Sequence, residues 1–226
     1  MKAIIGTDFH GDQSSFKSFA NVAEKEDVDV IIVCGDITNF GTPEDAKQLM
    51  ATVTVINRLV LFVPGNCDPP SLTELKMDGA YCIHGTSFEF QGFNFIGLGG
   101  SPKTPFGTPL EMTEEEISRV LDAAVGSIIN VNPIVLVSHS PPFNTRLDRT
   151  SLGIHVGSLS IRRFIEEKRP LAVFCGHIHE ARGKDQIDGT VLVNPGPARH
   201  GSFVLARLNN NDVSLEFSTR ALKGNI

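Results

Sequence analysis

The chain opens with the segment KAIIGTDFH, residues 2–10, and this segment decides the fold. Its first part, residues 2–6, is an apolar run with β-branched isoleucines, which is typical of a buried strand. The run leads into Asp8 and His10, where a dinucleotide-binding fold would show a GxGxxG loop. Side chains two residues apart in an extended segment point the same way, so both can reach one ion. The segment therefore predicts a buried strand that delivers metal ligands at its end.

Four more short motifs follow apolar, β-branched runs in the same way, one of them after a single proline. They are Gly35-Asp36, Gly65-Asn66-Cys67-Asp68, Ser138-His139-Ser140 and Gly176-His177-Ile178-His179. Each motif alone has an ordinary explanation as a turn, a helix cap or a hydrogen-bonded structural residue. Their joint occurrence, each at the end of a predicted strand, argues against a chance origin.

Together the motifs offer two aspartates, one asparagine and four histidines. The seven candidate metal ligands are Asp8, His10, Asp36, Asn66, His139, His177 and His179. A carboxylate has two oxygens, so Asp36 at the end of the second strand could hold two cations together. Paired metal ions hydrolyse phosphate esters. Mixed nitrogen and oxygen ligands suit Mn²⁺, Fe²⁺, Zn²⁺, Co²⁺ or Ni²⁺ better than Mg²⁺. The motifs therefore predict a centre with two divalent metal ions.

The bulk composition limits the possible partners. The 226 residues include 41% hydrophobic residues, which fits one α/β domain over residues 1–226. Their formal net charge of −6 disfavours the binding of long nucleic acids.

No apolar stretch approaches the roughly 20 residues that span a bilayer, and the first residues show no cleavable signal. The four cysteines lack CxxC spacing, and we expect no disulfide. We expect a cytoplasmic protein with a small phosphate-ester substrate and no membrane partner. The sequence is compatible with a homo-oligomer.

Strand-like and helical segments alternate along the chain. The expected strands are 2–6, 28–34, 59–63, 134–137, 171–174, 191–193, 203–208 and 213–217, and the expected helices are 13–26, 43–55, 114–129 and 158–168. Thr42 is a candidate N-cap before Pro43 at the first helical position. The early alternation implies a parallel sheet with helices on its faces. Residues 81–98 suggest short antiparallel hairpins, and the last three strands also read as antiparallel.

The ordered pattern D-x-H, G-D, G-N-x-D, H and G-H-x-H resembles the calcineurin-like metallophosphoesterases, from about Asp8 to Gly196. This resemblance implies a four-layer α/β/β/α sandwich, an α/β fold of two mixed sheets flanked by helices. It implies one metal held by Asp8, His10, Asp36 and His179, and a second held by Asp36, Asn66, His139 and His177. Asn66 and His139 would also belong to the catalytic residues. A metal-bridging hydroxide would attack phosphorus in line.

One position departs from the family pattern. The family's phosphatases generally carry G-N-H-[DE], and here Cys67 stands in place of the histidine. A thiol with an ordinary pKa near ~8.5 is a poor cation and an indifferent general acid at neutral pH. A cysteine there resembles the small bacterial and archaeal phosphodiesterases of the branch related to cyclic-nucleotide phosphodiesterases. We therefore favour a phosphodiesterase, with a broad phosphomonoesterase as the alternative and a non-catalytic protein-binding scaffold as the less favoured one.

A last candidate is His155, which lies in the Pro-rich, polar loop 140–156 between two ligand-bearing strands. From there it could project over the metals and protonate the leaving group, in place of the missing motif histidine. The ordinary alternative is that His155 caps or packs locally.

Overall fold

The first sheet supplies three of the five strand ends that carry candidate ligands. In the computed structural model, which describes residues 1–218, its seven strands run in the order β15-β14-β1-β2-β3-β5-β4. They are β1 (Lys2–Gly6), β2 (Val30–Cys34), β3 (Leu59–Val63), β4 (Lys76–Met77), β5 (Ala80–Cys82), β14 (Val204–Asn209) and β15 (Asp212–Phe217). Strands β1, β2, β3 and β5 are mutually parallel, so their C-terminal ends lie at one edge.

The second sheet supplies the other two ligand-bearing ends. Its six strands run in the order β12-β13-β11-β10-β7-β6. They are β6 (Ser87–Phe90), β7 (Phe93–Leu98), β10 (Ile134–Ser138), β11 (Ala172–Phe174), β12 (Gly183–Ile187) and β13 (Thr190–Asn194). The central strands β7, β10, β11 and β13 are parallel, and the edge strands β6 and β12 are antiparallel to their neighbours. A short separate pair, β8 (Ser101–Pro102) and β9 (Glu111–Met112), stands apart from both sheets.

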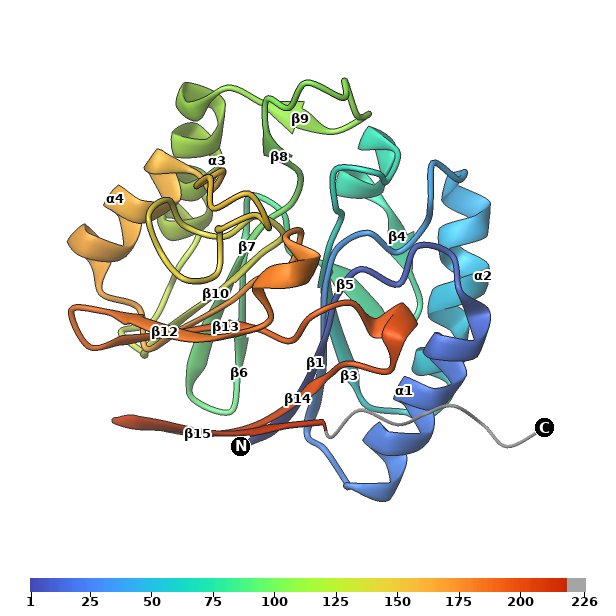
Figure 1. Cartoon of the computed structure of the whole chain (residues 1–226). Helices are drawn as coiled ribbons and strands as arrows, with labels where there is room; N and C mark the ends of the chain where they lie inside the picture. Colours follow the sequence, from blue (N-terminus) through green and yellow to red (C-terminus); the bar gives the residue numbers. More distant parts are fainter. Residues whose placement is uncertain (219–226) are drawn as a thin grey trace.

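Helices cover the outer face of each sheet, as Figure 1 shows. The helices α1 (Gln13–Lys25) and α2 (Pro43–Thr54) lie on the first sheet, and α3 (Glu114–Gly126) and α4 (Leu159–Lys168) lie on the second. Three short 3₁₀ helices, η1 (Pro70–Glu74), η2 (His179–Ala181) and η3 (Ala198–His200), sit in the connections. The expected four-layer α/β/β/α sandwich with two mixed sheets is confirmed.

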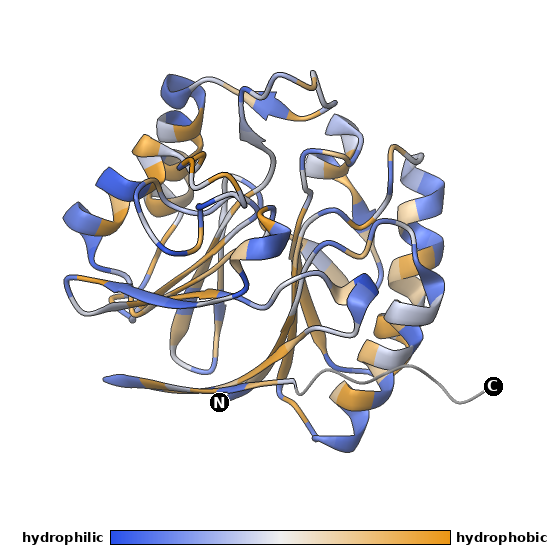
Figure 2. Cartoon of the chain, viewed as in Figure 1, coloured by the Kyte–Doolittle hydropathy of each residue, from blue (hydrophilic) through white to orange (hydrophobic). Residues whose placement is uncertain are grey.

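Side-chain alternation along the strands builds these layers. In β1, Ile4 packs against the helices, whereas Ala3 and Ile5 face the second sheet. Every residue of β2 is buried, because one face meets helices and the other meets the opposing sheet. Figure 2 accordingly shows hydrophobic strands in the interior and hydrophilic outer surfaces on the helices. The unbroken apolar runs of the sequence therefore reflect burial on both faces.

Local signals start the helices where the sequence predicts. The Thr42 side chain accepts a hydrogen bond from the Asp45 N–H, and the Asp45 carboxylate accepts one from the Thr42 N–H. This reciprocal capping box precedes Pro43 at the first position of α2, which confirms the predicted start. Within residues 1–218, none of the helices combines the length and the apolar character that crossing a membrane requires.

Two strand predictions need correction, and one strand was not predicted. The segment Ala80–Cys82 does not form a hairpin with its successors, because β5 joins the first sheet parallel to β3 while β6 and β7 form a hairpin in the second. The segment around Val191, expected to be antiparallel to the closing strands, forms β13, which is parallel to β11. Its antiparallel partner is β12, whose sequence GKDQI is largely polar because it lies at a sheet edge.

Side chains packed between the two sheets should contribute strongly to the stability of the protein. Phe95 on β7 is fully buried there, so Phe95→Ala should lower the free energy of unfolding by about 3–5 kcal/mol through lost burial and the cavity left behind. Phe106→Ala is the matched control, because Phe106 is 84% exposed and its truncation should change stability by less than about 0.5 kcal/mol. Urea unfolding measures both. Equal losses in the two variants would contradict this account of the core.

Candidate metal centre

The five motifs meet where the parallel strands of both sheets end. Asp8, Asp36 and Asn66 follow β1, β2 and β3, and His139 and His177 follow β10 and β11. Backbone hydrogen bonds connect these ends, among them Asp8 N–H to Gly35 C=O at 3.0 Å and Gly176 N–H to His139 C=O at 2.8 Å. The two sheets are joined where His177 N–H donates to Asp8 Oδ2 at 3.1 Å. Residues far apart in the sequence thus surround one buried point.

Several of the candidate ligands hold an unusual backbone conformation. Positive φ angles occur at Asp8 (55°), His10 (48°), Asp36 (49°) and His177 (69°). For residues with a Cβ atom this left-handed region is uncommon and costs of order 1 kcal/mol or more each. The backbone hydrogen bonds between the strand ends hold the chain in it. Such concentrated strain is typical of functional sites rather than of ordinary turns.

Two motif glycines are required by close approach. A Cβ atom on Gly65 would lie 2.0 Å from Asp36 Oδ1, and one on Gly176 would lie 1.9 Å from Thr7 Oγ1. Both separations are impossible for non-bonded atoms. The glycines of the G-N and G-H motifs therefore let neighbouring strand ends pack directly against the ligand-bearing loops.

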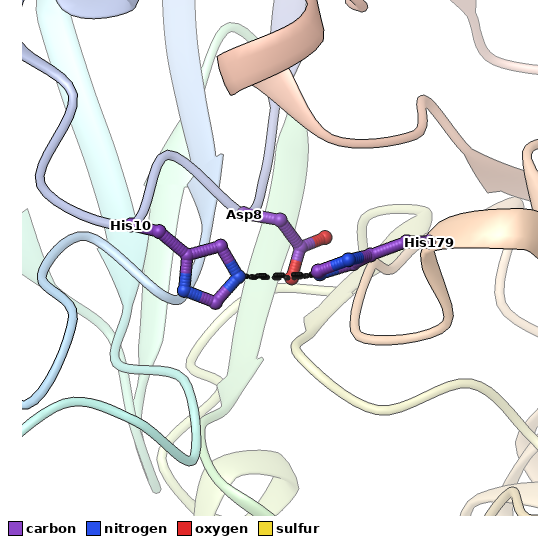
Figure 3. Close-up of side chains that lie close together, drawn as sticks. All are labelled: Asp8, His10 and His179. Carbon is purple, nitrogen blue, oxygen red and sulfur yellow. Dashed lines mark hydrogen bonds and ion pairs between the residues drawn. The ribbon is translucent and has the colours of Figure 1, made fainter.

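The first cluster contains Asp8, His10 and His179, and Figure 3 shows the two histidine rings in contact with the Asp8 carboxylate beside them. His10 Nε2 lies 3.2 Å from His179 Nε2, and Asp8 Oδ1 lies 3.3 Å from His179 Nε2. Asp36 Oδ2 is 3.5 Å from His10 Nε2. Ligand atoms held about 2.1 Å from a common ion stand about 3 to 3.5 Å apart. These separations fit four donors around one cation.

A second cluster surrounds the other oxygen of the Asp36 carboxylate. Asp36 Oδ1 is 3.6 Å from His139 Nε2, which in turn is 2.8 Å from Asn66 Oδ1. The His177 ring stands beside this group, with its centroid 5.1 Å from that of His139. Asp36 therefore faces both clusters, one with each oxygen, and the structure brings all seven predicted ligands to one place.

Several of the histidine rings can direct lone pairs into the site. His139 Nδ1 lies 2.8 Å from the Cys34 carbonyl, which can only accept, so this nitrogen carries a hydrogen, and in the neutral form of the ring Nε2 is the acceptor. Burial lowers the pKa of His10 to about 4 and that of His177 to about 3. Both rings are therefore neutral near pH 7, the state in which imidazole binds metals.

Two further observations fit cations at this place. Asp8 Oδ1 is buried and has no hydrogen bond of acceptable geometry within the described residues. Burial raises the pKa of Asp36 to about 7, so its carboxylate lacks the compensating positive charge that a buried anion needs. The Asp/His clusters could therefore hold metal ions, and their donor chemistry suits divalent cations.

Cys67 lies against these ligands. Its N–H donates to Asp36 Oδ1 at 2.9 Å, and its sulfur belongs to a group with His10 and Asp36 whose ligand atoms lie within 4.8 Å of one another. Burial raises the pKa of the Cys67 thiol well above its ordinary value, so the side chain is neutral. The sequence marks Cys67 only as the place of a missing imidazole, whereas the structure makes it a neighbour of the shared carboxylate.

His155 is held in the loop between β10 and α4. Its Nδ1 lies 2.7 Å from Asp148 Oδ1, a fully buried carboxylate that also accepts from Thr145 N–H and Gly157 N–H. The same loop is joined to Glu180, next to His179, by the Ser151 N–H at 2.9 Å. His155 thus has a structural role in its loop, and its predicted catalytic role stays a prediction.

Several further residues hold the ligands, and this role was not predicted for them from the sequence. Asn194 donates to Ile178 C=O at 2.9 Å and accepts from Gly196 N–H at 2.8 Å, which fixes the loop between His177 and His179. Arg199 Nη2 lies 3.3 Å from His179 Nδ1. In the sequence, Asn194 begins the segment Asn194-Pro195-Gly196, which by itself is compatible with a plain Pro-Gly turn.

Asp68 belongs to the G-N-C-D motif, but no role for it was predicted from the sequence. It is fully buried and accepts from the N–H groups of Ile37, Thr38 and Gly65. These bonds tie the loop after β2 to the loop after β3. Asp68 therefore fixes the spacing of Asp36 and Asn66 without facing the clusters itself.

Two known proteins are similar to this chain in sequence. The chain is 42% identical over 205 residues to an uncharacterized protein of Methanocaldococcus jannaschii, covering 87% of this chain and 88% of that protein. It is 25% identical over 160 residues to a 3',5'-cyclic-nucleotide phosphodiesterase of Nostoc sp., covering 69% of this chain and 58% of that protein, so it spans less than two thirds of that relative.

A solved structure shares the fold. The dimetal phosphatase from Danio rerio superposes with a TM-score of 0.66 at 13% identity, covering 96% of this chain and 95% of that one. Residues 1–210 match the calcineurin-like phosphoesterase superfamily domain, a family of phosphoester hydrolases. On the strength of this match, and with the ordered motifs meeting at one buried point, the chain belongs to the calcineurin-like phosphoesterase superfamily.

Proposed function

We propose that this protein is a phosphodiesterase that works with two divalent metal ions and acts on a small phosphate ester. The observation that carries the proposal is the pair of clusters that share Asp36, one on each carboxylate oxygen. A single carboxylate facing two sets of nitrogen and oxygen donors is the arrangement that two neighbouring cations need.

In this proposal the two clusters hold one ion each. Asp8, His10, Asp36 and His179 form the first set, and Asp36, Asn66, His139 and His177 form the second. When bound, a metal pair supplies activation of water and stabilisation of charge on the phosphoryl oxygens. The protein itself supplies rigid ligand positions, since the strand ends are fixed by backbone hydrogen bonds. Mn²⁺, Fe²⁺, Zn²⁺, Co²⁺ and Ni²⁺ are the proposed ions.

The neutral Cys67 side chain favours diesters over monoesters. A monoester carries up to two negative charges near neutral pH, and a diester carries one, so a monoester makes the larger demand for positive charge beside the metals. The position that could offer an imidazolium offers an uncharged thiol instead. The similarity to a relative described as a cyclic-nucleotide phosphodiesterase supports the same choice. A broad phosphomonoesterase is the second candidate.

The expected setting of the activity belongs to the proposal as well. The net charge of −6 supports a small substrate rather than a long nucleic acid. A cytoplasmic location and the lack of a membrane partner remain sequence-based expectations, and a homo-oligomer is compatible with them.

The shared carboxylate gives the most direct test of the two-metal arrangement. Asp36→Ala should lower hydrolysis of bis(p-nitrophenyl) phosphate by about 1000-fold or more, because metal-ion stabilisation is worth several kcal/mol. It should also reduce the Mn²⁺ bound per chain, measured by elemental analysis after dialysis. Asp122→Ala, a change at an exposed carboxylate on α3, is the control and should retain both. Full metal content and activity in Asp36→Ala would refute the two-metal proposal.

Substrate class is tested by comparing bis(p-nitrophenyl) phosphate with p-nitrophenyl phosphate under a panel of divalent ions. We expect a kcat/KM at least about 10-fold higher for the diester, a difference of about 1.4 kcal/mol in transition-state stabilisation. Cys67→His should raise monoester hydrolysis relative to diester hydrolysis, because it restores an imidazole beside Asp36. Cys67→Ser, which removes the thiol without adding a cation, is the matched control. A wild-type preference for the monoester would reject the diesterase assignment.

The catalytic hypothesis for His155 has its own test. If His155 protonates the leaving group, His155→Asn should slow a diester with an alkyl leaving group by about 100-fold and slow bis(p-nitrophenyl) phosphate only a few-fold. The reason is that nitrophenolate departs without a proton. The asparagine amide N–H takes the place of the Nδ1–H group and can still donate to Asp148, which preserves the loop. An equal loss with both substrates would indicate a structural role, and no loss would exclude the hypothesis.

A further inference from the structure

The loop between β8 and β9, at the top of the view in Figure 1, holds Asn66 at two points. The Leu110 N–H donates to the Asn66 carbonyl at 3.1 Å. The Asn66 side-chain amide donates from Nδ2 to Thr108 Oγ1, also at 3.1 Å. Asn66 is buried, so its amide has few alternative partners. The loop therefore controls both the backbone and the side chain of this ligand.

The direction of the Thr108 hydroxyl follows from its other partner. Glu111 Oε1 accepts from Thr108 Oγ1 at 2.7 Å, from Thr108 N–H at 2.8 Å and from Thr104 Oγ1 at 2.5 Å. Burial acts to raise the pKa of Glu111, but the hydrogen bonds from the two threonines outweigh it and lower the pKa to about 2. An ionised carboxylate can only accept. The hydroxyl hydrogen of Thr108 therefore points to Glu111, and its lone pairs face Asn66.

This polarity fixes which end of the amide enters the site. The Nδ2 group faces Thr108 and the sulfur of Cys67, at 3.1 and 3.6 Å, and both accept. The opposite end, Oδ1, lies 2.8 Å from His139 Nε2. His139 Nδ1 lies 2.8 Å from the Cys34 carbonyl and donates to it, so in the neutral form of the ring Nε2 has a lone pair. In that form two acceptors face each other at 2.8 Å, an arrangement that a cation between them would stabilise.

We propose that Thr108, oriented by Glu111, is a positioning residue that fixes the Asn66 amide so that its oxygen faces the second metal ion. The inference rests on the proposed function, which assigns Asn66 to that ion. It adds a role for a loop on which none of the five motifs lies. A rotated amide would direct NH₂ hydrogens toward the cation, so an undefined amide orientation weakens the second ion more than the first.

Two threonines give a matched pair of variants. Thr108→Val removes the hydroxyl that accepts from Asn66, and Thr104→Val removes a hydroxyl that donates to the same Glu111 oxygen without a hydrogen bond to Asn66. Both keep a β-branched side chain of similar volume. Thr108→Ser, which retains the hydroxyl, is the rescue variant. Thermal unfolding of the metal-free proteins establishes that each variant is folded.

The measurement is calorimetric titration of the metal-free full chain with Mn²⁺ alone. In Thr108→Val we expect the Kd of one of the two ions to rise by about 10-fold or more, the usual effect of removing a partner of a metal ligand, while the Kd of the other ion changes less than about 2-fold. Thr104→Val and Thr108→Ser should bind both ions as the wild type does.

Three results would overturn the inference. Unchanged affinities in Thr108→Val would show that the hydroxyl does not position Asn66. Equal weakening in the two valine variants would show that the loop acts only through its overall structure. A wild-type chain that binds a single Mn²⁺ would contradict the proposed function and the inference together, whereas the first two results leave the proposed function intact.

Discussion

The structure depends on one constraint: five strand ends from two sheets must bring their ligand atoms within about 3 to 4 Å of one another. The hydrogen bond from the His177 N–H to Asp8 Oδ2 meets this constraint across the sheets, and the bonds between Asp8 and Gly35 and between Gly176 and His139 meet it within the ring of loops. The unfavourable terms follow from the same constraint. They are the left-handed backbone at several ligands and the buried carboxylate of Asp36.

Local patterns predicted most of the fold because they coincide with burial. Strand β2 is apolar throughout since both of its faces are covered, and Thr42-Pro43 starts α2 through a capping box that is entirely local. The failures were non-local. Strand β12 is polar because it lies at an edge of its sheet. Strand β5 belongs to the first sheet because it pairs with β3. The hydrophobic periodicity of the sequence predicts neither the position of β12 at a sheet edge nor the pairing of β5 with β3.

In the candidate site, too, local sequence predicted some residues and non-local contacts determine others. The ligands stand directly after apolar runs, so their types and order sufficed to predict that they meet. The residues that orient them carry no comparable signal: Thr108 contacts Asn66 across 42 positions, and Asn194 contacts Ile178 across 16. Asp68 belongs to the G-N-C-D motif, but its hydrogen bonds to the loop after β2 are evident only from the structure. Metal ligands are therefore easier to predict from this sequence than the residues that orient those ligands.

Cys67 shows why substrate class and metal binding are coupled in this site. Its backbone N–H donates to Asp36, the carboxylate shared by both clusters, and its sulfur accepts from the Asn66 amide, whose other end faces His139. A substitution at Cys67 therefore acts on charge near the substrate and, at the same time, on two groups of the second cluster. A gain of monoester hydrolysis in such a variant has a charge explanation only if its Mn²⁺ affinities match those of the wild type. Measured together, the two quantities separate the effect of the imidazole from the effect of a displaced ligand.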